Sequence, residues 1–234
     1  MKSKTDLIFD FFGTLVKYIP ETFHSEPYVN TYDCLVKHGY AISYDDFIQA
    51  FGAAVNALEA RAKRDGKEYH MNQLVRLFFM SAFEKDAPLQ IRALLVSTFI
   101  EEWSRGISHF EGMDDFLSGL AKKYRLTVLS NTNYPPLIHD NLRAMGVVQH
   151  FNQVFTSVEI GIRKPHSAIF QHTLESLEIS ADQAVYIGDS YEADYLGASA
   201  AGMRCILIDP SGQYPEVADR IDTLYDLERH LNQL

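Results

Sequence analysis

Short apolar runs occur on both sides of one long stretch in which only helical periodicity is found. The first run, Thr5 to Phe11, has the length of a buried strand and leads into Gly13 and Thr14. From Lys17 onward, about ninety residues show apolar positions at helical spacing and no convincing strand. Strand-like and helical segments alternate from Phe110 to the end. We therefore expect an α/β protein whose first strand is separated from the others by an all-helical insertion.

The alternating part predicts a parallel sheet with helices on both faces. Its expected strands are Leu126–Leu129, Gln153–Phe155, Ala184–Ile187 and Cys205–Ile208. Within the insertion, helices are expected to begin near Ser25-Glu26-Pro27 and at Ser43, and to cover Met71–Phe83 and Pro88–Trp103. The expected domains are a core of residues 1–16 and 105–234 and a helical domain of residues 17–104.

Charge and composition exclude several classes of protein. Lys and Arg total 21 against 31 Asp and Glu, a net charge of -10 without a basic run, so nucleic acid is not an expected partner. The two cysteines, Cys34 and Cys205, have neither CxxC nor metal-ligand spacing. No secretion signal is recognised, and no apolar run approaches the ~20 residues of a membrane span. We expect a soluble cytoplasmic protein; the sequence indicates no particular oligomeric state.

Polar residues stand where the predicted strands end. Asp10 ends the first strand, Ser130 and Asn131 end the next one, and Asp189 ends a later one with Asp194 five residues on. The loop Gly161-Ile162-Arg163-Lys164-Pro165 places a lysine just before a helix. Because ligands of open α/β sheets bind beyond the carboxyl ends of the strands, we expect these groups to converge on one rim.

Carboxylates that face one another raise each other's pKa unless a cation lies between them. A hard divalent ion with oxygen ligands, Mg²⁺, resolves this conflict. With Mg²⁺ and Lys164 offsetting negative charge, a phosphoryl group can approach although the protein is acidic. A carboxylate held at the phosphorus can then act as a nucleophile.

With these residues the chain resembles the haloacid dehalogenase superfamily of hydrolases over its whole length. The resemblance is carried by DxxGTL at Asp10 to Leu15, the strand ending in Ser130-Asn131, GxxKP at Gly161 to Pro165, and GDSxxxD at Gly188 to Asp194. It implies a Rossmann-like core, a helical cap inserted after the first motif, and a magnesium-dependent attack by the first aspartate that forms an aspartyl intermediate.

The resemblance also implies roles for the acidic motifs. Asp10 is expected to be the nucleophile and a metal ligand, with the backbone carbonyl of Phe12 and the carboxylate of Asp189 as further ligands. Asp194 is expected to bind the metal directly or to hold the metal-binding residues in position.

The remaining motif residues are expected to bind the substrate. By the same resemblance, Ser130 donates to the phosphoryl oxygens, and Lys164 balances charge on the nucleophile and the phosphoryl group. Thr14 steadies the first loop beside the substrate, and Asn131 lies next to the phosphoryl site or has a structural role.

One position departs from the family pattern. Most phosphatases of this family carry a second aspartate two residues after the nucleophile, and this chain has Phe12 there. Phe cannot transfer a proton, and general acid-base help is worth ~10²–10⁴-fold in rate, so alkyl phosphates should react slowly unless another group substitutes. Tyr18, Glu21 and His24 are the candidates that the sequence offers.

We expect a magnesium-dependent hydrolase that acts on a small phosphorylated metabolite through Asp10. The first alternative is a metal-independent 2-haloacid dehalogenase, because those relatives commonly carry an aromatic residue at the position of Phe12. They usually have Ser-Asn, however, where this chain has Gly188-Asp189. The second alternative is a non-hydrolytic binding or regulatory protein that keeps the metal site.

Overall fold

The chain divides into two compact units. The computed structural model describes residues 5–19 and 27–233. One unit comprises Met1–Lys17 and His109–Leu234, and the other comprises Tyr18–Ser108. The boundaries expected from the sequence differ by one residue at the first crossing and by four at the second.

The two segments that link the units are short strands. β2 (Val16–Tyr18) pairs with β3 (Ile107–His109) in a two-stranded sheet. The expectation that helical structure begins at Lys17 is therefore wrong at this end, because three-residue strands are too short to show a periodicity of their own.

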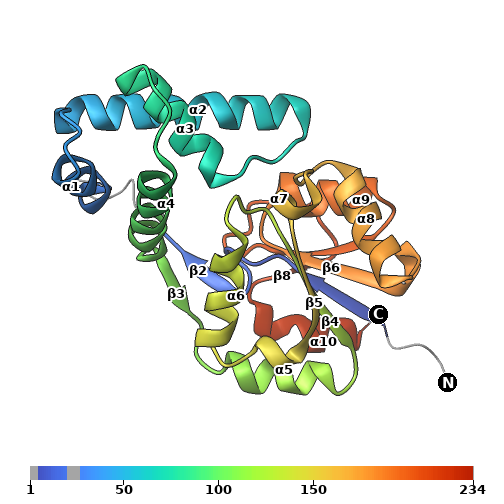
Figure 1. The fold of residues 1–234 in the computed structure, drawn as a ribbon. Helices are drawn as coiled ribbons and strands as arrows, with labels where there is room; N and C mark the ends of the chain where they lie inside the picture. Colours follow the sequence, from blue (N-terminus) through green and yellow to red (C-terminus); the bar gives the residue numbers. More distant parts are fainter. Residues whose placement is uncertain (1–4, 20–26, 234) are drawn as a thin grey trace. The chain divides into compact units, whose positions relative to one another are not determined.

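The first unit is built on a six-stranded parallel sheet (Figure 1). The strand order is β5-β4-β1-β6-β7-β8, and each neighbouring pair is parallel. The strands are β1 (Asp6–Phe9), β4 (Arg125–Ser130), β5 (Phe151–Thr156), β6 (Ala184–Gly188), β7 (Arg204–Ile208) and β8 (Arg220–Ile221). The chain runs outward from β1 on one side to β4 and β5, and on the other side to β6 and β7. The carboxyl end of β1 therefore lies at the point where the strand order reverses, where such sheets bind ligands.

Burial explains why the central strands read as continuous apolar runs. Leu7, Ile8 and Phe9 of β1 are all fully buried, because helices cover both faces of the sheet. Figure 1 shows α8 and α9 on one side of the sheet and α5 and α10 on the other. The helical elements of this unit are α5 (Met113–Ala121), α6 (Pro135–Ala144), α7 (Ser157–Ile160), α8 (Ser167–Leu177), the π-helical η4 (Tyr191–Leu196), α9 (Gly197–Ala200), α10 (Leu227–Leu231), and the short 3-10 turns η2 (Val148–His150), η3 (Ala181–Gln183) and η5 (Leu224–Asp226). The predicted α/β class, with a Rossmann-like parallel sheet, is confirmed.

The described residues of the second unit form four helices. They are α1 (Val29–Lys37), α2 (Tyr44–Asp65), α3 (Met71–Phe83) and α4 (Leu89–Ser104). The Ser43 hydroxyl caps α2 by accepting from the backbone N–H of Asp46, as the sequence indicates. The helix start expected at Ser25-Glu26 lies outside the described residues. Aromatic rings fill this unit's interior, for example Phe47 against Phe78 with centroids 5.6 Å apart.

Within the part of the chain that the structure describes, no helix has both the length and the hydropathy needed to cross a bilayer.

Candidate active site

Asp10 follows the central strand β1 directly. Its backbone N–H donates to the carbonyl of Ile187 on β6 at 2.8 Å, which extends the strand pairing by one residue. The side chain is 10% exposed, and its Oδ1 accepts a hydrogen bond from Lys164 Nζ at 2.7 Å. The expected nucleophile is therefore buried beside a cation.

Lys164 reaches this position from the loop before α8. Its side chain is 2% exposed, and Nζ lies 2.7 Å from Asp10 Oδ1 and 2.6 Å from Asp194 Oδ1. A third contact, at 2.7 Å, joins Nζ to the hydroxyl of Tyr186. One ammonium thus bridges two carboxylates.

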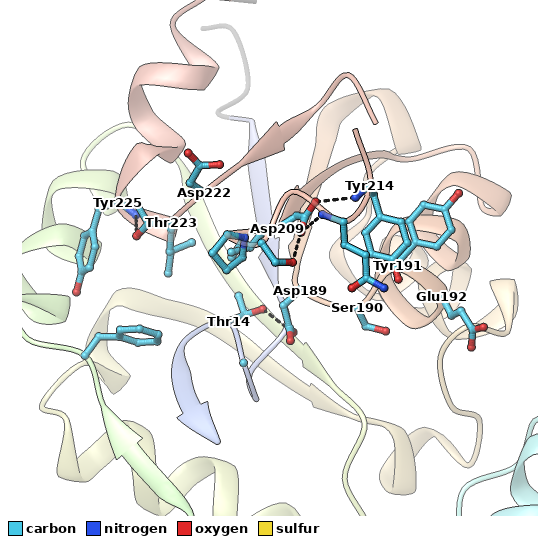
Figure 2. Close-up of a pocket in the computed structure, with 17 residues that line it drawn as sticks. Thr14, Asp189, Ser190, Tyr191, Glu192, Asp209, Tyr214, Asp222, Thr223 and Tyr225 are labelled. Atoms are coloured by element: carbon cyan, nitrogen blue, oxygen red, sulfur yellow. Dashed lines mark hydrogen bonds between the residues drawn. The ribbon is translucent and has the colours of Figure 1, made fainter. Parts of the chain in front are cut away.

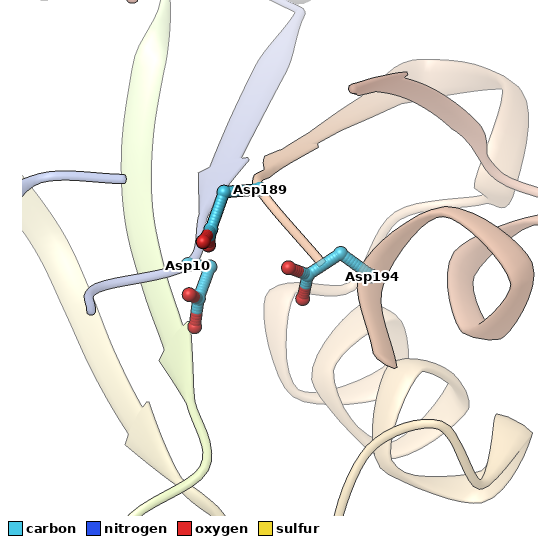
Figure 3. Close-up of side chains that lie close together, drawn as sticks. All are labelled: Asp10, Asp189 and Asp194. Atoms are coloured by element: carbon cyan, nitrogen blue, oxygen red, sulfur yellow. The ribbon is translucent and has the colours of Figure 1, made fainter. Parts of the chain in front are cut away.

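The third carboxylate, Asp189, comes from the end of β6 and is exposed at the rim. Carboxylate oxygens of Asp10, Asp189 and Asp194 all lie within 4.8 Å of one another (Figure 3). Asp194 belongs to η4 and is fully buried, with its Oδ2 accepting the backbone N–H of Ser190 at 2.9 Å. The structure therefore brings together the acidic residues that the sequence predicts to converge.

The protonation of these groups reflects burial and mutual repulsion. Burial raises the pKa of Asp10 to about 7, the charges of Asp194 and Asp189 act in the same direction, and Lys164 opposes them. Desolvation by the neighbouring protein atoms, followed by the charge of Asp194, raises the pKa of Asp189 to about 6. Burial by itself would lower the pKa of Lys164, but Asp10 and Asp194 hold it above its usual value. When all three acids are ionised beside one ammonium, two negative charges remain in excess, and a divalent cation with oxygen ligands would neutralise them.

The loop after β1 approaches Asp189 closely. Thr14 Oγ1 donates to Asp189 Oδ1 at 3.2 Å, which joins this loop to the end of β6. Gly13 has φ of +84°, and a Cβ built there would lie 2.1 Å from Asp189 Oδ2. Glycine is required here because the backbone is left-handed and a carboxylate occupies the space of a side chain.

Phe12 occupies the position where a general acid is expected. Its ring is half-buried and packs edge-on against Phe11, with centroids 5.0 Å apart. Its side chain has no proton to give. Glu21 and His24, two candidates to replace it, lie outside the described residues, and Tyr18 belongs to the helical unit, where its ring packs on Trp103.

Ser130 and Asn131 follow β4, the neighbour of β1. Ser130 is fully buried, and its hydroxyl has one long hydrogen bond, to the carbonyl of Asn131 at 3.4 Å. Asn131 uses its side chain on Lys164: Nδ2 donates to the Lys164 carbonyl at 3.0 Å, and Oδ1 accepts the Lys164 N–H at 2.8 Å. Asn131 thus positions the lysine loop, while direct contact of Ser130 and Asn131 with substrate stays a prediction.

A cavity of about 640 Å³ opens in the same unit beside Asp189 (Figure 2). Thr14 and Asp189 form one part of its wall, and Tyr191 and Tyr214 form another. The rings of Tyr191 and Tyr214 are stacked, with centroids 4.2 Å apart. Space for a small ligand therefore adjoins the acidic cluster.

One contributor to the site is absent from the residues that the sequence singles out. Tyr186 lies inside β6, and its hydroxyl contacts both Lys164 and Asp194. Sequence reasoning could have identified Tyr186 from its hydroxyl in an otherwise apolar buried strand, since a buried polar group needs a hydrogen-bond partner.

The central strand of the parallel sheet ends at a buried aspartate, beside a lysine and two further carboxylates. This arrangement is typical of an enzyme whose active site lies where the strand order of the sheet reverses. A family model described as haloacid dehalogenase-like hydrolase matches residues 7–208. The chain belongs to this family and is a hydrolase.

Curated relatives include phosphatases. Ribulose-1,5-bisphosphate 5-phosphatase of Halopiger xanaduensis is 27% identical over 98% of this chain and 96% of its own. Glyceraldehyde 3-phosphate phosphatase of Methanothermobacter thermautotrophicus is 30% identical over 63% of each chain. Haloacid dehalogenase-like hydrolase domain-containing protein 3 of Bos taurus is 35% identical over 47% of this chain, and the match spans 44% of that protein.

A solved structure has the same fold. The 2-haloacid dehalogenase of Pseudomonas syringae pv. Tomato DC3000 superposes with a TM-score of 0.75 at 22% identity, covering 99% of both chains. At this identity the likeness establishes the fold alone.

Proposed function

We propose that the protein is a magnesium-dependent phosphatase that transfers the phosphoryl group of a small metabolite to Asp10 and then to water. The observation that carries this proposal is the convergence of three carboxylates and one buried lysine at the end of β1. The phosphatase relatives support phosphate esters as the substrate class. A cytoplasmic location is part of the same proposal.

The donor set fits Mg²⁺. Asp10, the Phe12 carbonyl and Asp189 would hold the ion, and Asp194, whose oxygens already bond Lys164 and the Ser190 N–H, would support them. When bound, the ion offsets negative charge on the carboxylates and the phosphoryl oxygens. The close approach of Gly13 to Asp189 keeps that carboxylate near the loop that carries Phe12.

The chain's own residues would perform the displacement. The Asp10 carboxylate attacks phosphorus and forms an acyl phosphate as the bond to the leaving oxygen breaks. Lys164 stays paired with Asp10 and balances charge on the carboxylate and on the phosphoryl group, while Ser130 donates to the phosphoryl oxygens. Water then cleaves the acyl phosphate and restores Asp10. We assign the helical unit, Tyr18–Ser108, the role of a cap that selects the substrate and excludes bulk water.

Phe12 determines which substrates suit this site. Without a general acid at that position, the leaving group must depart unprotonated or take its proton elsewhere. Acyl and aryl phosphates have leaving groups that depart as stable anions. They are therefore the substrates for which the wild-type protein should be most competent.

The test is one assay panel of acyl, aryl and alkyl phosphates and 2-haloacids, with Mg²⁺ and with EDTA, on wild type and Asp10→Asn. We expect phosphate release that needs Mg²⁺ and is abolished by Asp10→Asn, because an amide is not a nucleophile at phosphorus. Halide release that survives EDTA would establish the dehalogenase instead. Labelling of Asp10 by an acyl phosphate without turnover would establish the non-hydrolytic protein.

A further inference from the structure

Tyr186 places a hydroxyl at the centre of the candidate site although it lies inside a strand. It is the third residue of β6, its side chain is fully buried, and its ring packs against Phe170 with centroids 5.2 Å apart. Phenylalanine would fill the same space. A fully buried hydroxyl is costly unless it is hydrogen-bonded, so the contacts of this oxygen decide its role.

The hydrogen bonds around Lys164 account for each of its protons. An ammonium group has three N–H donors and no acceptor. The acceptors are Asp10 Oδ1 at 2.7 Å, Asp194 Oδ1 at 2.6 Å and Tyr186 Oη at 2.7 Å. Two of these acceptors are carboxylates, and Tyr186 is the neutral one.

Because Tyr186 accepts from Lys164, its own proton must go elsewhere. The carbonyl of Leu129 receives it at 3.0 Å, and Asp194 Oδ1 lies 3.2 Å away. Leu129 belongs to β4 and precedes Ser130. The Tyr186 hydroxyl thus links Lys164, in the loop before α8, to the backbone of β4 beside the site.

We propose that Tyr186 is a positioning residue that holds Lys164 Nζ against the nucleophile Asp10. This inference rests on the proposed function of the site. Lysine has four rotatable side-chain bonds, and Asp194 competes with Asp10 for its charge. A third acceptor, attached to a rigid ring in the central sheet, keeps Nζ between the two carboxylates. Without this hydroxyl, one buried N–H has no acceptor in this arrangement, and Nζ moves to satisfy it.

The test compares Tyr186→Phe with Tyr195→Phe. Tyr195 packs against the same apolar cluster as Tyr186, so both variants remove a hydroxyl from one region. With an acyl or aryl phosphate, we expect Tyr186→Phe to lower kcat about 10- to 100-fold with KM changed less than about threefold, the effect of misplacing one charged hydrogen-bond donor. We expect Tyr195→Phe to keep kcat within about twofold of wild type.

Two further measurements separate positioning from a structural role. In a Lys164→Met background, Tyr186→Phe should cause no additional loss of kcat, because the tyrosine acts through the lysine. Crystal structures of wild type and Tyr186→Phe should show Nζ displaced from hydrogen-bond distance to Asp10 in the variant. An equal loss in both backgrounds, an unchanged kcat, or an unmoved Nζ would overturn the inference. A wild-type protein without phosphatase activity would refute the proposed function, and the crystal comparison would still decide whether Tyr186 places Nζ.

Discussion

The side-chain amide of Asn131 hydrogen-bonds to both the backbone N–H and the backbone carbonyl of Lys164. Nδ2 donates to the Lys164 carbonyl, and Oδ1 accepts the Lys164 N–H. The two residues are 33 positions apart, so this pair ties the loop after β4 to the loop before α8. The lysine is therefore placed through its backbone as well as through its ammonium group.

Asn131→Asp should weaken this placement. An aspartate can still accept the Lys164 N–H, but its second oxygen then faces the Lys164 carbonyl oxygen. We expect the free energy of unfolding to fall by about 1–3 kcal/mol and kcat to fall about tenfold. Asn133→Asp adds the same charge two residues along the same loop and is the control. Equal losses in the two variants, in phosphatase assays and urea unfolding, would show that charge and not the amide pairing matters.

Phe12→Asp should make the turnover rate depend less on how readily the leaving group departs without a proton. The introduced carboxyl can protonate a departing alkoxide, so turnover of alkyl phosphates should rise by about 10²-fold, while aryl and acyl phosphates change little. The measurement is kcat for a series of esters that differ in leaving-group pKa. Phe12→Ala removes the ring without adding an acid and is the control. A gain that Phe12→Ala reproduces would assign the effect to space and not to proton transfer.

Gly13→Ala should disable the acidic site through Asp189. The added methyl would lie 2.1 Å from Asp189 Oδ2, so the carboxylate must move away from the first loop. Mg²⁺ should raise the melting temperature of wild type and not of this variant, because ligand binding stabilises only a protein with an intact site. Gly39→Ala is the matched control, since Gly39 has φ of +81° and none of the described residues beyond its chain neighbours comes within 4 Å of a built Cβ. Persistence of the Mg²⁺-dependent shift in Gly13→Ala would contradict the proposed role of Asp189.

Protonation of Asp209 at low pH should make the sheet-containing unit less stable. Burial by itself would raise its pKa, but hydrogen bonds from the Tyr214 and Gln213 N–H groups, the Ser211 hydroxyl and Arg220 lower it to about 2. Because the folded pKa lies below the unfolded value, the stabilisation is present above about pH 4 and is lost as pH falls toward 2.

The test for Asp209 is urea unfolding of wild type and Asp209→Asn at several pH values. The difference in unfolding free energy between the two proteins should be greatest above about pH 4 and shrink as pH falls to 2. Asp222→Asn, an exposed carboxylate that also lines the cavity, is the control. A difference that does not vary with pH would refute the assignment of the stabilisation to the ionised form of Asp209.

The class of the fold could be predicted because its signals are local. Leu7, Ile8 and Phe9 of β1 are three apolar residues in succession, which indicates a strand buried on both faces, and the spacing of apolar residues around Phe47 and Phe51 indicates a helix. The linking strands β2 and β3 escaped prediction because each is three residues long and their pairing joins residues about ninety positions apart.

The sequence by itself determined the order of strands and helices and the residue types at the strand ends, because propensity, periodicity and turn chemistry act between near neighbours. The family resemblance predicts that Lys164 balances charge on Asp10, 154 positions away, but only the tertiary structure decided that the same ammonium also contacts Asp194 and that Tyr186 supplies its third acceptor. The same holds for the role of Asn131, whose amide partner is a backbone and not another motif residue. Such pairings depend on strand order and on which loops meet at one edge of the sheet, and no local pattern encodes that geometry.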